Sequence, residues 1–147
     1  MTAETSQSIC LEIDSALSNT TLLAMAVRGI CAMTTLSPVE INRLELCLVE
    51  VVNNAIQHAY DRQSGHKVEA LVELSETIFC ITVSDWGAVM PAEQLEHQEA
   101  LQIDPDLPDS WLCSGRGLYI VKSLMDGVEY SSHQGKNSLR MIKQLRH

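Results

Sequence analysis

The stretch EVVNNAIQHAY, residues 50–60, carries Glu50, Asn54 and His58 at successive steps of four residues. Side chains four residues apart lie above one another on an α-helix, so this spacing predicts a polar stripe along one helix face. The intervening residues are mainly Val, Ile and Ala, which suit burial against a core. The stripe therefore either meets solvent or faces a functional site, and the helix alone leaves both interpretations open.

The residues before this stretch contain a start signal for the helix. Ser37 suits the N-cap, Pro38 the first helical position and Glu40 the third, and together they form a capping box. A cap of this kind typically stabilises a helix by about 1 kcal/mol. The helix that carries the polar stripe is therefore predicted to begin at Pro38.

The rest of the chain alternates between strand and helix patterns. The expected strands are residues 8–14, 67–74, 77–84 and two within 128–145 around a turn at 134–137; further helices are expected at 15–36 and after the glycines 115–117. This order of elements predicts an α/β (α+β) two-layer sandwich. Its helices are expected on one face of a mixed, largely antiparallel sheet.

Length and composition favour one domain over residues 1–147, because 147 residues with 46% hydrophobic content suffice for a single core. No apolar run is long enough to span a bilayer, and the first residues lack the pattern of a signal peptide. We therefore expect a cytoplasmic protein without a membrane partner. Residues 88–114 hold six acidic residues, three prolines and no Lys or Arg, and they predict a lid. The alternative is a short solvated helix at 91–101 followed by a loop.

Charge and cysteine usage exclude several classes of function. The net charge of −9 argues against direct binding of nucleic acid, which normally needs a basic surface. The five cysteines are widely spaced without a CxxC pair, so reduced core thiols are expected rather than disulfides or a zinc site. The five histidines form no pattern typical of metal ligands.

Two glycine-containing motifs suit a nucleotide. Gly115-Arg116-Gly117 before a helix would let free backbone N–H groups approach phosphate, with a guanidinium beside them, although an ordinary turn has the same composition. Asp85 ends an apolar strand and is followed by Gly87. Its carboxylate could accept a hydrogen bond from an exocyclic amino group of a base, or it could simply form a turn.

The polar stripe offers groups for metal binding and catalysis. Mg²⁺ in nucleotide sites is typically held by one or two protein oxygens together with phosphates, and the Asn54 carbonyl could supply one. Glu50, one turn earlier, could accept a proton from an attacking hydroxyl. The alternative is that both side chains only bond loops that cross the helix.

Taken together, the three motifs resemble those of a known superfamily. E-x3-N-x3-H-A-Y on a helix, D-x-G after a strand and S-G-x-G-L-x-I-V before a helix are similar to the ATP-binding domain of gyrase, heat-shock-90, histidine kinase and mismatch-repair proteins. The small free-standing form resembles the anti-sigma factor serine/threonine kinases. The resemblance implies a Bergerat-type ATP-binding fold.

The resemblance also implies a role for each motif residue. Glu50 would be the general base, Asn54 the Mg²⁺ ligand, Asp85 the group that recognises the adenine amino group, and Gly87 a residue that shapes the pocket. The phosphate-binding residues would be Gly115, Arg116, Gly117 and, within the same motif, Leu118. His58 and Tyr60 would have supporting roles.

The chain departs from the superfamily at one position. The second glycine of the usual D-x-G-x-G motif is replaced by Val89. A side chain there would narrow the nucleotide pocket or alter the hinge of the lid, and a β-branched residue resists positive φ.

The implied function is an ATP- and Mg²⁺-dependent protein kinase that holds a sigma factor inactive and phosphorylates a small anti-sigma factor antagonist. Such kinases commonly act as homodimers. Two alternatives use the same ATP site: a partner-switch module that binds ATP without phosphoryl transfer, and the detached catalytic domain of a histidine kinase.

Overall fold

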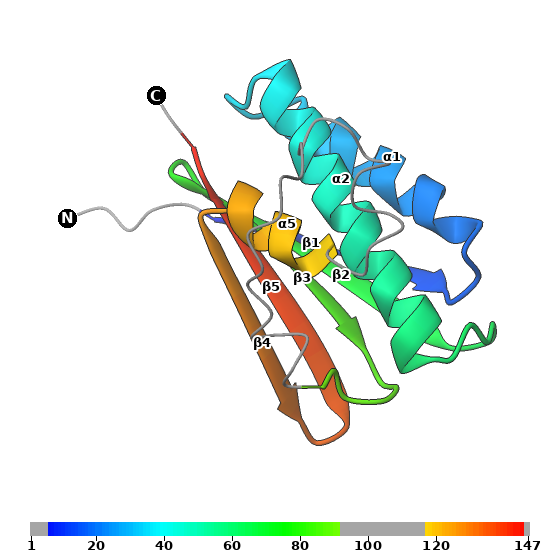
Figure 1. The fold of residues 1–147 in the computed structure, drawn as a ribbon. Helices are drawn as coiled ribbons and strands as arrows, with labels where there is room; N and C mark the ends of the chain where they lie inside the picture. Colours follow the sequence, from blue (N-terminus) through cyan, green and yellow to red (C-terminus); the bar gives the residue numbers. More distant parts are fainter. Residues whose placement is uncertain (1–5, 92–116, 146–147) are drawn as a thin grey trace.

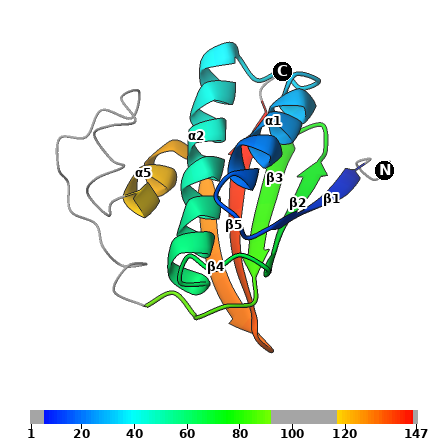
Figure 2. The ribbon, with the colours of Figure 1, turned by 90° about the vertical axis from the view of Figure 1, so that its right-hand side faces the viewer.

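The computed structural model describes residues 6–91 and 117–145, in which three α-helices and one π-helical turn cover one face of a five-stranded sheet (Figure 1). Figure 2 shows the helices on the same side of the strands from a second direction. The elements are β1 (Gln7–Asp14), α1 (Asn19–Cys31), α2 (Pro38–Asn54), η1 (Ala55–Ala59), β2 (Lys67–Leu74), β3 (Ile78–Asp85), α5 (Gly117–Leu124), β4 (Gly127–His133) and β5 (Lys136–Gln144). The predicted two-layer α/β architecture is confirmed.

The sheet has the strand order β1-β2-β3-β5-β4. Every pairing between the described strands is antiparallel, so the parallel component implied by a mixed sheet is not found in this part of the chain. The strands expected at residues 67–74 and 77–84 are present as β2 and β3, which pair as an antiparallel hairpin. The order places β3 and β5, which are far apart in the sequence, side by side at the centre.

The last hairpin is tighter than the sequence predicts. Gln134 and Gly135, with φ of 52° and 81°, form a two-residue loop, and Lys136 and Asn137 already belong to β5. Turns of this kind match the twist of the strands they join and require positive φ. The shorter turn brings Asn137 into the sheet, opposite Asp85.

Helix α2 begins as predicted. The Ser37 hydroxyl accepts a hydrogen bond from the Glu40 backbone N–H, and the Glu40 carboxylate accepts one from the Ser37 N–H, each at 3.2 Å. Helix α1 is shorter than the predicted 15–36, because the Ser15 hydroxyl and N–H donate to the Gln63 and His66 carbonyls. These contacts hold the start of the predicted helix against the loop after η1.

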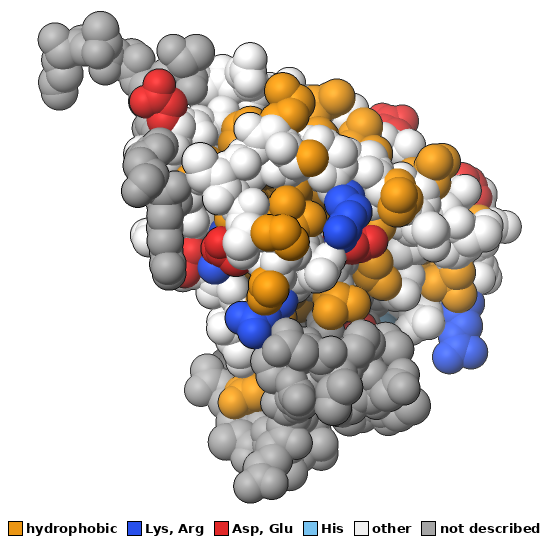
Figure 3. Space-filling view, turned by 90° about the horizontal axis from the view of Figure 1, so that it is seen from above, with side chains coloured by type: hydrophobic (Ala, Val, Ile, Leu, Met, Phe, Trp, Pro, Cys, Tyr) orange, Lys and Arg blue, Asp and Glu red, His pale blue; other side chains and the backbone are white. Residues whose placement is uncertain are grey.

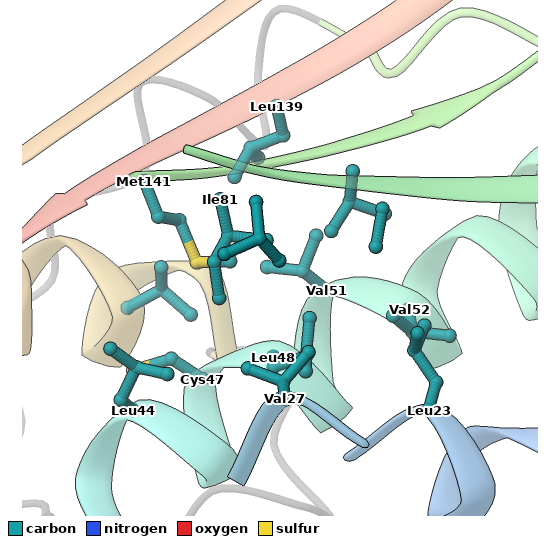
Figure 4. Close-up of a cluster of buried hydrophobic side chains, with 14 of the residues drawn as sticks. Leu23, Val27, Leu44, Cys47, Leu48, Val51, Val52, Ile81, Leu139 and Met141 are labelled. Carbon is teal, nitrogen blue, oxygen red and sulfur yellow. The ribbon is translucent and has the colours of Figure 1, made fainter. Parts of the chain in front are cut away.

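The core lies between the helices and the sheet (Figure 4). Val27 of α1, Leu48 of α2 and Ile81 of β3 are each at most 1% exposed and point into this layer. Two of the predicted core thiols, Cys31 and Cys47, lie there with no exposed surface, and burial raises their pKa values to about 11 and about 12. The expectation fails for the exposed Cys10, which lies on the edge strand β1.

Some hydrophobic side chains also reach the surface, and Figure 3 shows them beside charged groups on the face seen from above. On α1, Leu22 and Met25 are 67% and 57% exposed. Arg28, on the same helix, donates to the Glu45 carboxylate at 2.7 Å and ties α1 to α2.

Within the described ranges, no helix combines the length and the apolar character needed to cross a membrane. From residue 92 onward, the predicted lid and the alternative helix lie outside the described residues.

Candidate nucleotide-binding site

A cavity of about 290 Å³ lies where the end of α2 faces the ends of β3 and β5. Its described wall consists of Val51, Asn54, Ala55, His58, Ala59, Val83, Asp85, Ala88, Val89, Met90, Pro91, Tyr130, Asn137, Ser138 and Leu139. Asn54 and Asp85, which the sequence assigned to one site, therefore line the same cavity. The mainly apolar wall with a few convergent polar groups is typical of a small-molecule site.

The helix wall of the cavity changes geometry at Asn54. Helix α2 passes into a π-helical turn, η1, in which the Tyr60 N–H donates to the Ala55 carbonyl at 3.1 Å, five residues back. The sequence predicts an unbroken α-helix and does not reveal this turn, which is a feature often found at functional sites. Asn54 and His58 nevertheless share the cavity. Glu50 is half-buried on α2 and does not belong to the described cavity wall.

Asp85 is held by two donors on one of its two oxygens. Its Oδ1 accepts hydrogen bonds from Asn137 Nδ2 at 2.8 Å and from the Gly87 N–H at 3.0 Å. Its Oδ2 has no hydrogen-bond partner among the described residues and remains available to a ligand. Burial raises the pKa of Asp85, while the two donors act in the opposite direction. The arrangement can accept a hydrogen bond from the amino group of a base.

Asn137 is the residue that sequence reasoning missed. It is 3% exposed, and besides Asp85 its amide nitrogen contacts the Gly87 carbonyl at 2.9 Å. The sequence assigned it to a turn. The alternation of Asn137 with Leu139 and Met141, all three buried, is the signal that could have placed it on the inner face of β5.

Tyr60 anchors the loop that follows Asp85. Its hydroxyl donates to the Lys67 carbonyl at 2.6 Å and accepts from the Trp86 N–H at 2.7 Å, and its ring stacks on His66. Tyr60 therefore joins the end of η1 to the start of β2 and the end of β3. The exposed side chain of His58 instead lines the cavity, so its supporting role stays a prediction.

Position 87 requires glycine because the backbone passes close to the Ala59 carbonyl, and not because its φ angle is positive. A Cβ atom at this position would overlap the Ala59 carbonyl and lie 2.9 Å from Tyr60 Cδ1. The adjacent Ala88 N–H donates to the same carbonyl at 2.9 Å. The glycine thus lets the loop pack on η1, which is a different reason from the room for a base that the sequence suggested.

Val89 occupies the cavity wall without backbone strain. It is 60% exposed, and the non-glycine residues with positive φ in the described chain lie elsewhere, at Asp61, Arg62 and Gln134. The expected conflict between a β-branched side chain and positive φ therefore does not arise. Its side chain does line the cavity, as the sequence led us to expect.

Glu50 and Asn54 are placed differently on α2, because Asn54 lines the cavity and Glu50 does not belong to its described wall. The Asn54 amide makes no side-chain hydrogen bond within the described residues and lines the cavity. Burial raises the pKa of Glu50, which makes its carboxylate a stronger base than an exposed one. The described ranges contain no group of three or more His, Cys, Asp or Glu residues able to hold a metal. An unpartnered amide oxygen fits Mg²⁺, which takes one or two protein oxygens together with phosphates.

The glycine motif is described only in part. Gly115 and Arg116 lie outside the described residues, and Gly117 is the first residue of α5. Leu118 is 7% exposed and belongs to the hydrophobic core rather than to the described cavity wall. The start of α5 is a place where free N–H groups favour phosphate, and the roles of these residues stay predictions.

The described fold, with helices over one face of an antiparallel sheet, is that of an ATPase-type domain. The family model for the histidine kinase-like ATPase domain matches residues 13–143, and the chain belongs to this family. The resemblance inferred from the motifs is thereby confirmed.

Individual relatives place the chain within the family. It is 29% identical over 137 residues to the anti-sigma F factor of Pasteuria penetrans, which covers 92% of this chain and 89% of that protein. It is 25% identical over 114 residues to the serine-protein kinase RsbW of Bacillus subtilis, covering 78% of this chain and 71% of that protein. The relatives are thus named as anti-sigma factors and as serine-protein kinases.

A solved structure supports the fold. The crystal structure of the RsbU and RsbW domains of Rv1364c from Mycobacterium tuberculosis matches with a TM-score of 0.66 and 14% identity. The match covers 96% of this chain and 33% of the longer one. At this identity the likeness concerns the fold alone.

Proposed function

We propose that this protein is an ATP- and Mg²⁺-dependent serine/threonine kinase that acts in the cytoplasm as an anti-sigma factor. In this proposal it sequesters a sigma factor, phosphorylates a small antagonist protein and works as a homodimer. The observation that carries the proposal is the convergence of Asn54 and Asp85 on one cavity, from elements far apart in the sequence. The names of the relatives support the choice of kinase and partners.

The two walls of the cavity would bind different parts of the nucleotide. Asp85 Oδ2, at the sheet wall, accepts a hydrogen bond from the adenine amino group. The Asn54 carbonyl, at the helix wall, would be one ligand of Mg²⁺, which would neutralise phosphate charge when it is bound. The phosphates would then lie near Asn54, one helical turn from Glu50 on α2.

Glu50 would act on the second substrate. The hydroxyl oxygen of a Ser or Thr on the antagonist bonds to the γ-phosphorus, the bond from that phosphorus to ADP breaks, and Glu50 accepts the hydroxyl proton. A positioned general base typically contributes about 10² to 10⁴ in rate. The raised pKa of Glu50 suits this role, because a base is most effective when its pKa lies closer to the working pH.

The partner surface is supported by charge and by exposed apolar side chains. A chain with net charge −9 is complementary to a basic partner protein, which favours encounter and specificity. The exposed Leu22 and Met25 on α1 offer apolar contact area. Capture of the chain's partner from cell extract, followed by its identification, tests whether that partner is a sigma factor.

The kinase activity is tested by transfer of labelled phosphate from Mg-ATP to the candidate antagonist. We predict that Glu50→Gln binds ATP normally and loses about 10² to 10⁴ in transfer rate. Glu73→Gln is the matched control, because Glu73 is exposed on β2 and lies on the sheet face opposite the cavity. Transfer by Glu50→Gln at the wild-type rate would exclude Glu50 as the base. ATP binding by the wild type without transfer to any candidate would favour the partner-switch module.

A further inference from the structure

Asn137 bonds to three neighbouring segments through one buried amide. Its nitrogen donates to Asp85 Oδ1 at 2.8 Å and to the Gly87 carbonyl at 2.9 Å, with the Ala88 carbonyl further away at 3.4 Å. Its oxygen accepts from the Ser132 hydroxyl at 2.6 Å. β5, β3, the loop after β3 and β4 therefore meet at this side chain.

The surroundings fix which way the amide points. On one side lie Asp85 Oδ1 and the Gly87 carbonyl, which can only accept, so the NH₂ group must face them. A reversed amide would place its oxygen against both acceptors. The Ser132 hydroxyl on the opposite side donates to the amide oxygen and reinforces this orientation.

We propose that Asn137 is a positioning residue that determines base selectivity by occupying Asp85 Oδ1, so that Oδ2 alone meets the base. Because Oδ2 can only accept, the site prefers a ring edge with an amino group, as in adenine, over an edge with a carbonyl, as in hypoxanthine. The proposal rests on the proposed nucleotide site. It goes beyond that site because it assigns the preference to a residue that reaches the base only through Asp85.

The Asn137→Asp variant separates this role from simple space filling. Aspartate has nearly the same shape, but its carboxylate would lie within hydrogen-bond distance of Asp85 Oδ1 and offer no donor. If Asn137 only filled space, the aspartate would be tolerated. If it positions Asp85, the two carboxylates repel and Asp85 turns away from the productive geometry.

The test is calorimetric titration of the full chain with ADP and with inosine diphosphate, in which a carbonyl replaces the amino group, both with Mg²⁺. We expect the wild type to prefer ADP. Asn137→Ala should lower ADP affinity by about tenfold and leave inosine diphosphate unchanged, because Asp85 Oδ1 then keeps only the Gly87 N–H as a donor and the carboxylate is held less firmly. Asn137→Asp should lower ADP affinity further, and Asn137→Thr should recover part of the preference by restoring a donor.

Ser132→Ala provides an independent measurement if the Asn137 variants fail to fold. Ser132 is exposed, so the loss of its hydroxyl leaves the core intact. The oxygen of the Asn137 amide then loses the hydrogen bond that it accepts from this hydroxyl. We expect its preference for ADP to fall about threefold. An unchanged preference in Asn137→Ala, or wild-type ADP affinity in Asn137→Asp, overturns the inference and leaves the nucleotide site standing. A wild type that binds neither nucleotide overturns the proposed function, and the inference with it.

Discussion

The two walls of the cavity differ in how far their polar groups are already engaged. At the sheet wall, one oxygen of Asp85 has two donors, and the loop after it is bonded to Tyr60 and Asn137. At the helix wall, the Asn54 amide has no side-chain hydrogen bond within the described residues. In the proposed function, the wall that would recognise the base is therefore held by hydrogen bonds before a ligand arrives, whereas the wall that would bind metal and phosphate depends on the ligand for its contacts.

This difference matches the chemistry of the two ends of a nucleotide. A base is a rigid ring read by directional hydrogen bonds, and a site that is already in place loses little entropy on binding it. Phosphates and Mg²⁺ bring strong charges and several waters of their own, so few protein groups are needed in advance. Changes at the sheet wall should therefore act on all nucleotides of a given base, and changes at the helix wall only when the metal is present.

The largest effect is expected from Asp85→Asn. With Asn137 donating to the atom that replaces Oδ1, the new amide would turn its NH₂ group toward the base and meet the adenine amino group donor to donor. ADP affinity should fall by about 100-fold, with or without Mg²⁺. Calorimetry in Mg²⁺ and in chelator gives both values. A loss confined to the Mg²⁺ experiment would mean that Asp85 acts on the phosphate end and would break the comparison between the walls.

Gly87→Ala tests the rigidity of the sheet wall in the absence of any nucleotide. The new methyl group would overlap the backbone carbonyl of Ala59, which cannot move without disturbing η1. We expect a loss of about 2 kcal/mol in the free energy of unfolding, measured by denaturant titration. Gly29→Ala on α1 is the control, because a methyl group there would meet no atom within 4 Å beyond its own helix backbone, and alanine favours a helix. Equal free energies of unfolding for the two variants would show that the loop after β3 can shift to accommodate the methyl group.

The sequence predicts more of the helix wall than of the sheet wall, for a physical reason. Asn54 and His58 follow one local period, so helix geometry places both on the same wall, whereas Glu50 of the same stripe does not line the described cavity. The partnership of Asp85 and Asn137 instead depends on the register between β3 and β5, and the two residues are 52 positions apart in the sequence. Strand register is set by turn length and by packing, and the loop here is two residues rather than four.

The π-helical turn η1 also cannot be predicted from the local sequence pattern. Residues 55–59 have no glycine or proline that would signal a change of helix type. The turn ends where Ala59 accepts from Ala88 and where Gly87 passes close by, so its contacts come from a distant part of the chain. Because these contacts join distant parts of the chain, the sequence predicts a role for Gly87 in the pocket and does not reveal that Gly87 packs on η1.

A smaller effect is expected at the helix wall, from Asn54→Ala. The variant removes one oxygen ligand from Mg²⁺ and, within the described residues, breaks no side-chain hydrogen bond. The affinity for Mg-ATP should fall by about tenfold, while the affinity for ADP in chelator stays unchanged. Paired calorimetric titrations measure this difference. If ADP binding in chelator fell as well, Asn54 would contribute to the shape of the cavity rather than to the metal.

The smallest effect is a pH dependence that should act in opposite directions on binding and on stability. Burial raises the pKa of Asp85 in the folded protein above its unfolded value, so between these two values the folded state binds more protons. The Asp85 contribution therefore stabilises the fold as the pH drops through this window, and the same proton occupies the acceptor that adenine needs. ADP affinity should thus fall by at most about tenfold per pH unit while the apo protein gains stability from this group.

Two variants assign that pH dependence to Asp85. Three other side chains of titratable type lie nearby: His58 on η1, Tyr60 directly after η1 and Tyr130 on β4. Asp85→Asn should abolish the low-pH decline in ADP binding, whereas His58→Gln should keep it. A decline that disappears in His58→Gln and persists in Asp85→Asn would assign the proton to the helix wall. That result would make the helix wall, and not the fixed carboxylate of β3, the part of the cavity that senses pH.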